Sequence, residues 1–144
     1  MSEPGRLHAF KLDRRGLARV FGELEATVME TMWALGSATV ADVSERLEES
    51  VHYKTLMTVM NRLVDKGALR RRRRSRAYVY SPAETREAFM IRVSRRVVQG
   101  LVLDFGDAAV AQMVDALEDV DPALINRLRA LANADADAED EGGR

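Results

Sequence analysis

The sequence predicts a mainly α-helical protein that carries one short β-hairpin near its middle. The chain has 144 residues, of which 47% are hydrophobic and 31% are charged, the balance of a soluble globular protein with one domain or two very small ones. Apolar residues recur at helical spacing along most of the chain. Residues 69–81 break this pattern, and they include the strand-favouring run from Ala77 to Tyr80.

Three amphipathic helices are expected before the hairpin, over residues 22–35, 40–48 and 55–66. Their apolar residues lie on one face at steps of three and four, and Gly36 and Gly67 end the first and the third. Thr39 is expected to cap the second helix, with Asp42 in its first turn.

The hairpin is expected to pair residues 69–73 with residues 77–81. Ser81, Pro82 and Glu84 then form a capping-box pattern, which predicts a fourth helix from that point to about residue 103. Two more helices are expected, opening at Asp107 and at Asp121-Pro122. The acidic, small-residue-rich end of the chain is expected to be disordered.

Charge is balanced overall and segregated locally. The net charge is −1, but residues 52–76 carry +8 and residues 104–144 carry −8. A compact basic segment inside a neutral protein points to a surface that binds a polyanion.

The basic segment coincides with the third helix and the hairpin. A short second helix, a tight turn and a third helix with a polar outer face describe a helix-turn-helix, and a basic hairpin after it is the wing of a winged helix. The third helix would enter the DNA major groove. Its expected contact residues are Lys54, Thr55, Thr58, Asn61 and Arg62, where Asn61 could equally cap or solvate its helix.

The arginines of the hairpin would contact the DNA backbone or the minor groove. The candidates are Arg72, Arg73, Arg74 and Arg76, within the run that starts at Arg70. One strand face is expected to point inward, so that not all of these side chains reach DNA.

The later helices predict a homodimer interface, because their apolar stripe is too long for the winged domain alone to cover. The expected interface residues are Phe89, Val93, Val97, Leu101, Val110, Met113, Val114, Leu117, Leu124 and Leu128. The alternative is that these helices close into a core within one chain. The predicted organisation is therefore a flexible N-terminal extension over 1–21, a winged-helix domain over 22–82, a helical dimerisation region over 83–131 and a disordered acidic tail over 132–144.

Several classes of function find no support in the sequence. The chain has no cysteine and two histidines, so no metal site or cofactor is expected. No nucleophile elbow, P-loop or zinc-protease motif indicates an enzyme. No apolar run suits a membrane span or a signal peptide, and a cytoplasmic location is expected. A nonspecific nucleic-acid binder and a protein-interaction module remain as alternatives.

Three segments, ELEATVMETMWALGSATVADVSERL, YKTLMTVMNRLVDKGALRR and RAYVYSPAETRE, resemble the penicillinase-repressor family, the BlaI/MecI/CopY transcriptional repressors. The resemblance covers about residues 22–131. It implies a cytoplasmic homodimer that binds double-stranded operator DNA of dyad symmetry. The resemblance places Thr55, Thr58, Asn61 and Arg62 on the recognition helix and Arg73, Arg74, Arg76 and Tyr78 in the wing. In several members a membrane sensor-protease relieves repression, and the resemblance raises such a protease as a partner.

The sequence departs from the family pattern at three places. Lys54 stands where a second Thr is frequent, Ser75 stands where the wing tip often has Gly, and the cysteines of copper-responsive members are absent. Copper sensing by that route is therefore excluded.

Overall fold

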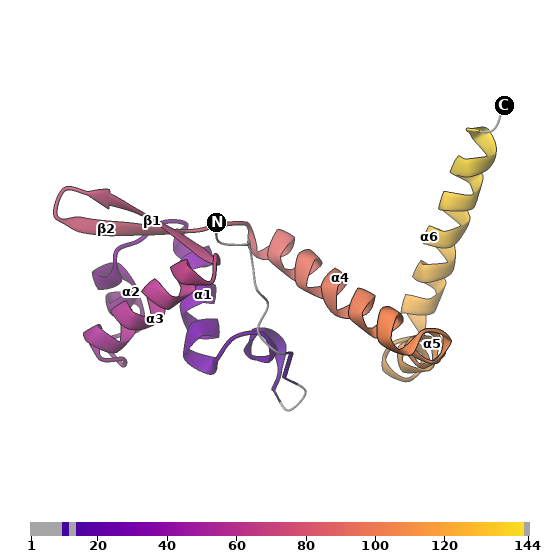
Figure 1. Ribbon diagram of the computed structural model, residues 1–144, viewed down its shortest axis with the longest axis horizontal. Helices are drawn as coiled ribbons and strands as arrows, with labels where there is room; N and C mark the ends of the chain where they lie inside the picture. The colour runs from indigo at the N-terminus through magenta and orange to yellow at the C-terminus, as the bar shows by residue number, and fades with distance from the viewer. Residues whose placement is uncertain (1–9, 12–13, 143–144) are drawn as a thin grey trace. The chain divides into compact units, whose positions relative to one another are not determined.

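The computed structural model describes residues 10–11 and 14–142, and it confirms a mainly α-helical fold with one antiparallel hairpin. In chain order the elements are η1 (Gly16–Arg19), α1 (Glu23–Leu35), α2 (Val40–Arg46), α3 (Tyr53–Asp65), β1 (Leu69–Arg74), β2 (Ala77–Pro82), α4 (Arg86–Phe105), α5 (Asp107–Val120) and α6 (Pro122–Glu141) (Figure 1). Two compact units divide the chain, the first ending at Ser94 and the second beginning at Arg95. The predicted domain boundary at residue 82 therefore differs from the observed one, because the first turns of α4 belong to the first unit.

Local capping sets the helices of the first unit, as the sequence indicates. The side chain of Thr39 accepts a hydrogen bond from the Asp42 amide at 3.1 Å, and the Asp42 carboxylate accepts one from the Thr39 amide at 2.9 Å. Gly36 has a φ of 80° after α1, a conformation that favours glycine. Helix α3 begins two residues earlier than predicted, where the His52 ring accepts a hydrogen bond from the Lys54 amide at 3.3 Å.

Apolar faces of α1, α2 and α3 meet to form the core of the first unit. The side chains that are fully buried there include Val28, Met32, Val43, Leu56, Met60 and Leu63. The apolar face of α3 lies inside, so its polar face is left outside.

The end of the predicted N-terminal extension belongs to this core. Leu17, Val20 and Phe21 are buried, and the Phe21 ring stacks on that of Phe89 with centroids 5.3 Å apart. Leu17 lies in η1, and Val20 and Phe21 follow directly after it. These three apolar side chains lie within five positions and pack against α1. The prediction of a flexible extension is therefore wrong from residue 17 onward, and its residues 1–9 and 12–13 lie outside the described residues.

The two strands pair in register from Leu69 opposite Pro82 to Arg74 opposite Ala77. The loop of two residues has Ser75 in the left-handed region, with a φ of 57°. Tyr80 also pairs with Ala38 through two backbone hydrogen bonds of 2.8 and 2.9 Å, so the hairpin is tied to the core at one point beyond its own ladder.

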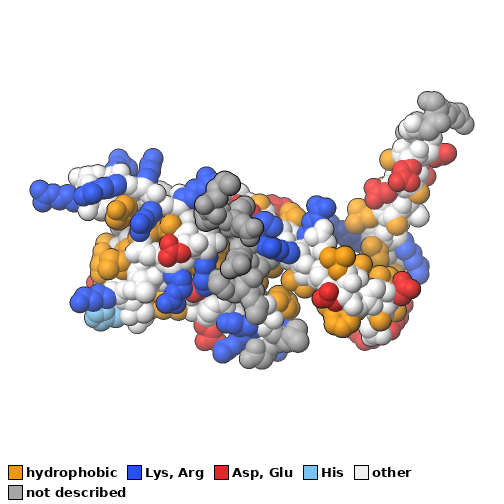
Figure 2. Space-filling view, in the orientation of Figure 1, with side chains coloured by type: hydrophobic (Ala, Val, Ile, Leu, Met, Phe, Trp, Pro, Cys, Tyr) orange, Lys and Arg blue, Asp and Glu red, His pale blue; other side chains and the backbone are white. Residues whose placement is uncertain are grey.

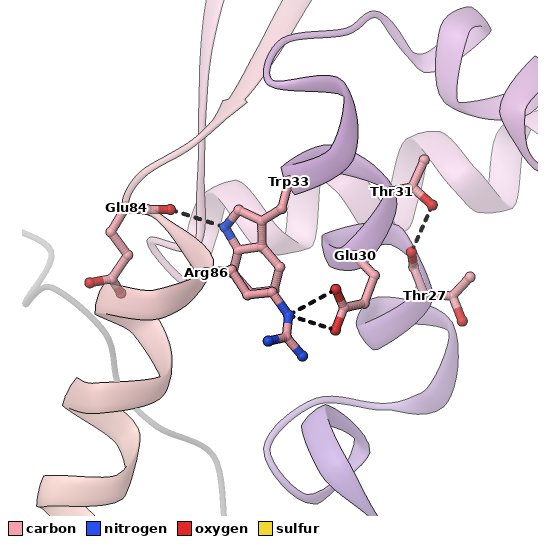
Figure 3. Close-up of polar contacts among 6 residues, drawn as sticks. All are labelled: Thr27, Glu30, Thr31, Trp33, Glu84 and Arg86. Atoms are coloured by element: carbon pink, nitrogen blue, oxygen red, sulfur yellow. Dashed lines mark hydrogen bonds and ion pairs between the residues drawn. The ribbon is translucent and has the colours of Figure 1, made fainter.

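The predicted capping box at Ser81 is wrong, because strand pairing continues past it. The Ala83 amide donates to the Ala68 carbonyl at 3.0 Å, and the Glu84 carbonyl accepts a hydrogen bond from the Trp33 indole at 3.0 Å (Figure 3). Helix α4 begins four residues later, where the Thr85 hydroxyl accepts from the Ala88 amide at 3.1 Å. Tertiary hydrogen bonds thus outweigh a local cap.

The start of α4 packs on α1 within the first unit. Phe89 is 2% exposed and lies against Phe21 and Trp33, and Val93 is 7% exposed. Arg86 reaches across to the Glu30 carboxylate at 3.0 Å (Figure 3), and this hydrogen bond and charge raise the pKa of Arg86. Phe89 and Val93 are therefore covered in their own chain, which removes both from the predicted dimer interface.

Replacing Phe89 with alanine is expected to lower the free energy of unfolding by about 3 kcal/mol, because it opens a cavity between two aromatic rings. Denaturant titration of the full chain measures this loss. Ile91→Ala serves as the control, since Ile91 is 62% exposed on the same helix. A Phe89→Ala protein that keeps the stability of the wild type but changes its oligomeric state would contradict the packing role.

The second unit consists of the rest of α4 with α5 and α6. Asp121 caps α6 as predicted, its carboxylate accepting from the Ala123 amide at 3.0 Å. Among the described side chains of this unit, residues 95–140 and 142, none is buried. Helix α6 continues to Glu141, so the prediction of disorder from residue 132 is wrong as far as this residue. Alternate alanines after Leu131 account for the helix, since alanine has the highest helix propensity.

Candidate nucleic-acid interface

The outer face of α3 presents the polar side chains that the sequence predicted. Lys54, Thr55, Thr58 and Arg62 are exposed, and Asn61 is half-buried. The Thr58 hydroxyl donates to the Lys54 carbonyl at 2.9 Å, so its oxygen keeps its capacity to accept hydrogen bonds. This face combines donors and acceptors with positive charge.

Two large apolar side chains on α3 are also exposed and were not predicted as site residues. Tyr53 is 50% exposed and Met57 is 41% exposed. With Asn61 they follow a spacing of four residues, so they lie along one edge of the helix. Their position outside the apolar face of α3 is the sequence signal that could have identified them.

Arginines cover both faces of the hairpin. In β1 only Leu69 is buried, and Arg70 to Arg74 and Arg76 are all exposed. Figure 2 shows Lys and Arg side chains gathered along the hairpin, at the left of the view. The expectation that one strand face points inward is met at Leu69 and Tyr80, which are buried on the same face. Towards the tip, which projects past the helices, neither face is buried (Figure 1).

Strand register separates the arginines into two sets. Residues directly opposite each other in an antiparallel pair share a face. Arg71 and Arg73 therefore lie with their partners Tyr80 and Tyr78, and Arg70, Arg72 and Arg74 lie on the other face. The guanidinium of Arg71 stands over the Tyr78 ring at 4.7 Å from its centroid.

Asn61 connects α3 to the hairpin. Its Oδ1 accepts hydrogen bonds from Arg71 Nη1 at 2.7 Å and from the Tyr80 hydroxyl at 2.8 Å. The sequence left open whether Asn61 contacts DNA or caps or solvates its own helix. The structure shows a role outside these alternatives, a link between α3 and the hairpin. Arg71 belongs to the arginine run expected to contact DNA, but its link to Asn61 was not predicted. The expected pairing of residues 69–73 with 77–81 places Arg71 opposite Val79, whereas the observed register places it opposite Tyr80.

A buried carboxylate of α1, that of Glu25, lies beside the C-terminal end of α3. Glu25 of α1 is 6% exposed, and Lys66 Nζ lies 2.7 and 2.8 Å from its two oxygens. Arg62 Nη1 is 3.8 Å from the same group, while its side chain remains 56% exposed. The Glu25 charge is thus paired from the α3 side and does not oppose an approaching phosphate.

Among the residues that the structure describes, no group of three or more His, Cys, Asp or Glu side chains could hold a metal ion. None of the described helices has the length and apolar character that a membrane crossing requires. What the first unit presents is an exposed helix face beside an arginine-rich hairpin, a surface suited to an extended polyanion.

Comparison with known proteins gives matches that agree with this description. The family model for the penicillinase repressor matches residues 21–134. The transcriptional regulator BlaI of Mycobacterium tuberculosis, in strains CDC 1551 / Oshkosh and ATCC 25618 / H37Rv, is 34% identical over 98 residues. This alignment covers 66% of the present chain and 62% of the regulator, so the chain spans less than two thirds of the length of these relatives.

Solved structures with a similar trace include two of MarR from E. coli. The oxidized form has a TM-score of 0.41 and 23% sequence identity, with 69% of this chain and 74% of that chain covered. A mutant complexed with operator DNA has a TM-score of 0.42 and 21% identity, with 69% and 75% covered. The family model accounts for most of the chain, and the protein belongs to the penicillinase repressor family.

Proposed function

We propose that the protein is a sequence-specific, DNA-binding transcriptional repressor that acts as a homodimer on operators with dyad symmetry. One observation carries the proposal: the polar face of α3 and the arginine hairpin are joined through Asn61 into one surface. A recognition helix reads base edges in the major groove, and the adjoining arginines hold the phosphate backbone. Family membership supports the same function.

The composition of α3 favours sequence reading over nonspecific binding. A purely electrostatic binder needs only cations, whereas α3 exposes the hydroxyls of Tyr53, Thr55 and Thr58 and the side chain of Met57 beside its Lys and Arg. Threonine contacts either base edges or the methyl group of thymine, and arginine pairs with guanine. These contacts would distinguish one sequence from another.

The second unit supports the homodimer. Residues that are apolar but exposed lie along all three of its helices, among them Leu101, Val110, Val114, Leu124 and Leu128. An apolar groove of about 420 Å³ lies between the end of α4 and α5, lined by Leu101, Phe105, Ala108, Ala109, Gln112, Met113 and Ala116. Helices without a buried side chain need cover to be stable, and a second copy would supply it. Val97, Met113 and Leu117, which are half-buried, would complete the interface.

Relief of repression by a membrane sensor-protease is the part of the proposal that rests on family membership alone. Mixing the repressor with membranes from induced cells and following its mass tests this part. A discrete cleavage product would support it, and an intact chain in derepressed cells would contradict it.

Selection of bound duplexes from a randomised pool tests the proposed function. The full chain is used at near-physiological salt. Enrichment of an inverted repeat, with half-sites about one helical turn (~10 bp) apart, is the expected result. Binding without enrichment would instead identify a nonspecific binder with a steep salt dependence.

Thr58→Ala and Arg62→Ala are expected to change which bases are enriched, because both side chains lie on the reading face of α3. A lost contact to one base pair should cost about 1–3 kcal/mol of discrimination at that position. Repeating the selection with each variant measures the change. An equal loss of affinity on every duplex, with the same bases preferred, would show that α3 does not read the sequence.

A further inference from the structure

Asn61 lies in the C-terminal half of α3, and its amide oxygen is directed to the hairpin. The two groups that donate to Oδ1 are Tyr80 Oη, at 2.8 Å, and Arg71 Nη1, at 2.7 Å. Tyr80 and Arg71 are direct partners across the two strands. A single oxygen atom thus joins the recognition helix to both strands of the hairpin.

The core fixes the position of the first donor. Tyr80 is 2% exposed, and its backbone exchanges two hydrogen bonds with Ala38, of 2.8 and 2.9 Å. Its hydroxyl is therefore a fixed point, and the buried side chain has no access to DNA. Arg71, in contrast, is exposed and is held between the Asn61 oxygen and the ring of Tyr78.

Both lone pairs of the Asn61 oxygen are occupied by these donors. An asparagine that reads adenine must accept from the base amino group while it donates to the ring nitrogen. An amide oxygen has two acceptor positions, and here neither is open. Asn61 is thus unsuited to the base contact that its place on α3 suggests.

We propose that Asn61 is a positioning residue, which holds Arg71 and the hairpin against α3 so that helix and wing meet DNA as one preformed surface. This inference rests on the proposed function and assigns one residue a part in it. Preformed surfaces bind more tightly because less conformational freedom is lost on binding.

Tyr80→Phe tests the proposal without altering any group that reaches DNA. The full chain is titrated onto the duplex enriched by selection and onto a scrambled duplex. We expect affinity to fall about threefold to tenfold on both, the effect of one hydrogen bond, with the base preference of the wild type retained. Hydrogen exchange of the hairpin amides should become faster in the free protein.

Asn61→Ala should reproduce these effects, since it removes the common acceptor. In the Asn61→Ala protein, adding Tyr80→Phe should cause no further loss, because the hydroxyl has already lost its partner. Trp33→Phe is the matched control: it also removes one hydrogen bond made by an aromatic side chain, the one to Glu84, two residues after β2, and it leaves Asn61 and both of its donors unchanged. It should lower the melting temperature and leave DNA affinity unchanged.

Two results would overturn the proposal. One is a Tyr80→Phe protein that binds both duplexes as tightly as the wild type. The other is an Asn61→Ala protein that changes the preferred base at one operator position, which would identify Asn61 as a reader. Failure of the proposed function is distinguished from both, because it would show in the wild-type chain as a lack of binding or of enrichment.

Discussion

Replacing Arg72 and Arg74 together by alanine is expected to weaken DNA binding about a thousandfold at physiological salt. The two side chains are exposed on the hairpin face opposite to Tyr80, so the link from Asn61 to Arg71 stays intact. Two lost phosphate contacts per subunit are about four in a dimer. Each contact contributes about 0.9 to the slope of log K against log salt, so the loss of four lowers the magnitude of this slope by nearly four. At physiological salt this corresponds to an affinity about 10³ times lower.

Fluorescence anisotropy titrations between 50 and 300 mM salt measure both quantities. Arg127→Ala with Arg129→Ala is the matched control, because it removes two exposed arginines from α6 and causes the same change in net charge. Its salt slope should equal that of the wild type. An unchanged slope for the hairpin variant would show that the wing does not touch phosphates.

Replacing Val114 with aspartate is expected to convert the protein to a monomer and to reduce operator affinity by a factor of a thousand or more. Val114 is 38% exposed on α5 in the single chain, and a symmetric dimer would bury two copies of it. Two unpaired carboxylates in an apolar interface cost several kcal/mol. A monomer then binds one half-site at a time, and the gain from linked half-sites is lost.

Sedimentation at micromolar concentration gives the mass, and titration onto the selected operator gives the affinity. Asn126→Asp adds the same charge at an exposed position of α6 and should remain dimeric. A Val114→Asp protein with the mass of a dimer would place the interface elsewhere. A wild-type chain that is monomeric on its operator would refute the homodimer.

The sequence predicts the parts of the fold that depend on neighbouring residues. The helix spacing, the Thr39–Asp42 cap and the hairpin were found because each is a pattern within a few positions. The Ser81 cap was predicted by the same local rule and is wrong, because Ala68 and Trp33 supply partners from elsewhere in the chain. Sequence patterns do not report such distant hydrogen bonds.

The candidate site shows the same division. The exposed residues of α3 follow from the helical spacing of its apolar residues. The spacing of Phe89 and Val93 likewise predicts that both are buried, but it does not show whether the same chain or a second copy buries them. The double hydrogen bond at Asn61 needs the register of the strands and the position of α3 together. Neither can be read from single residues.

A change in half-site spacing tests the central claim, a dimer that reads two half-sites, most directly. The full chain is titrated onto the selected inverted repeat and onto the same duplex with 5 bp inserted between the half-sites. The insertion rotates one half-site by about half a helical turn, to the opposite face of the DNA. We expect affinity to fall at least a hundredfold. Equal affinity for both duplexes would contradict a dimer that reads two half-sites on one face.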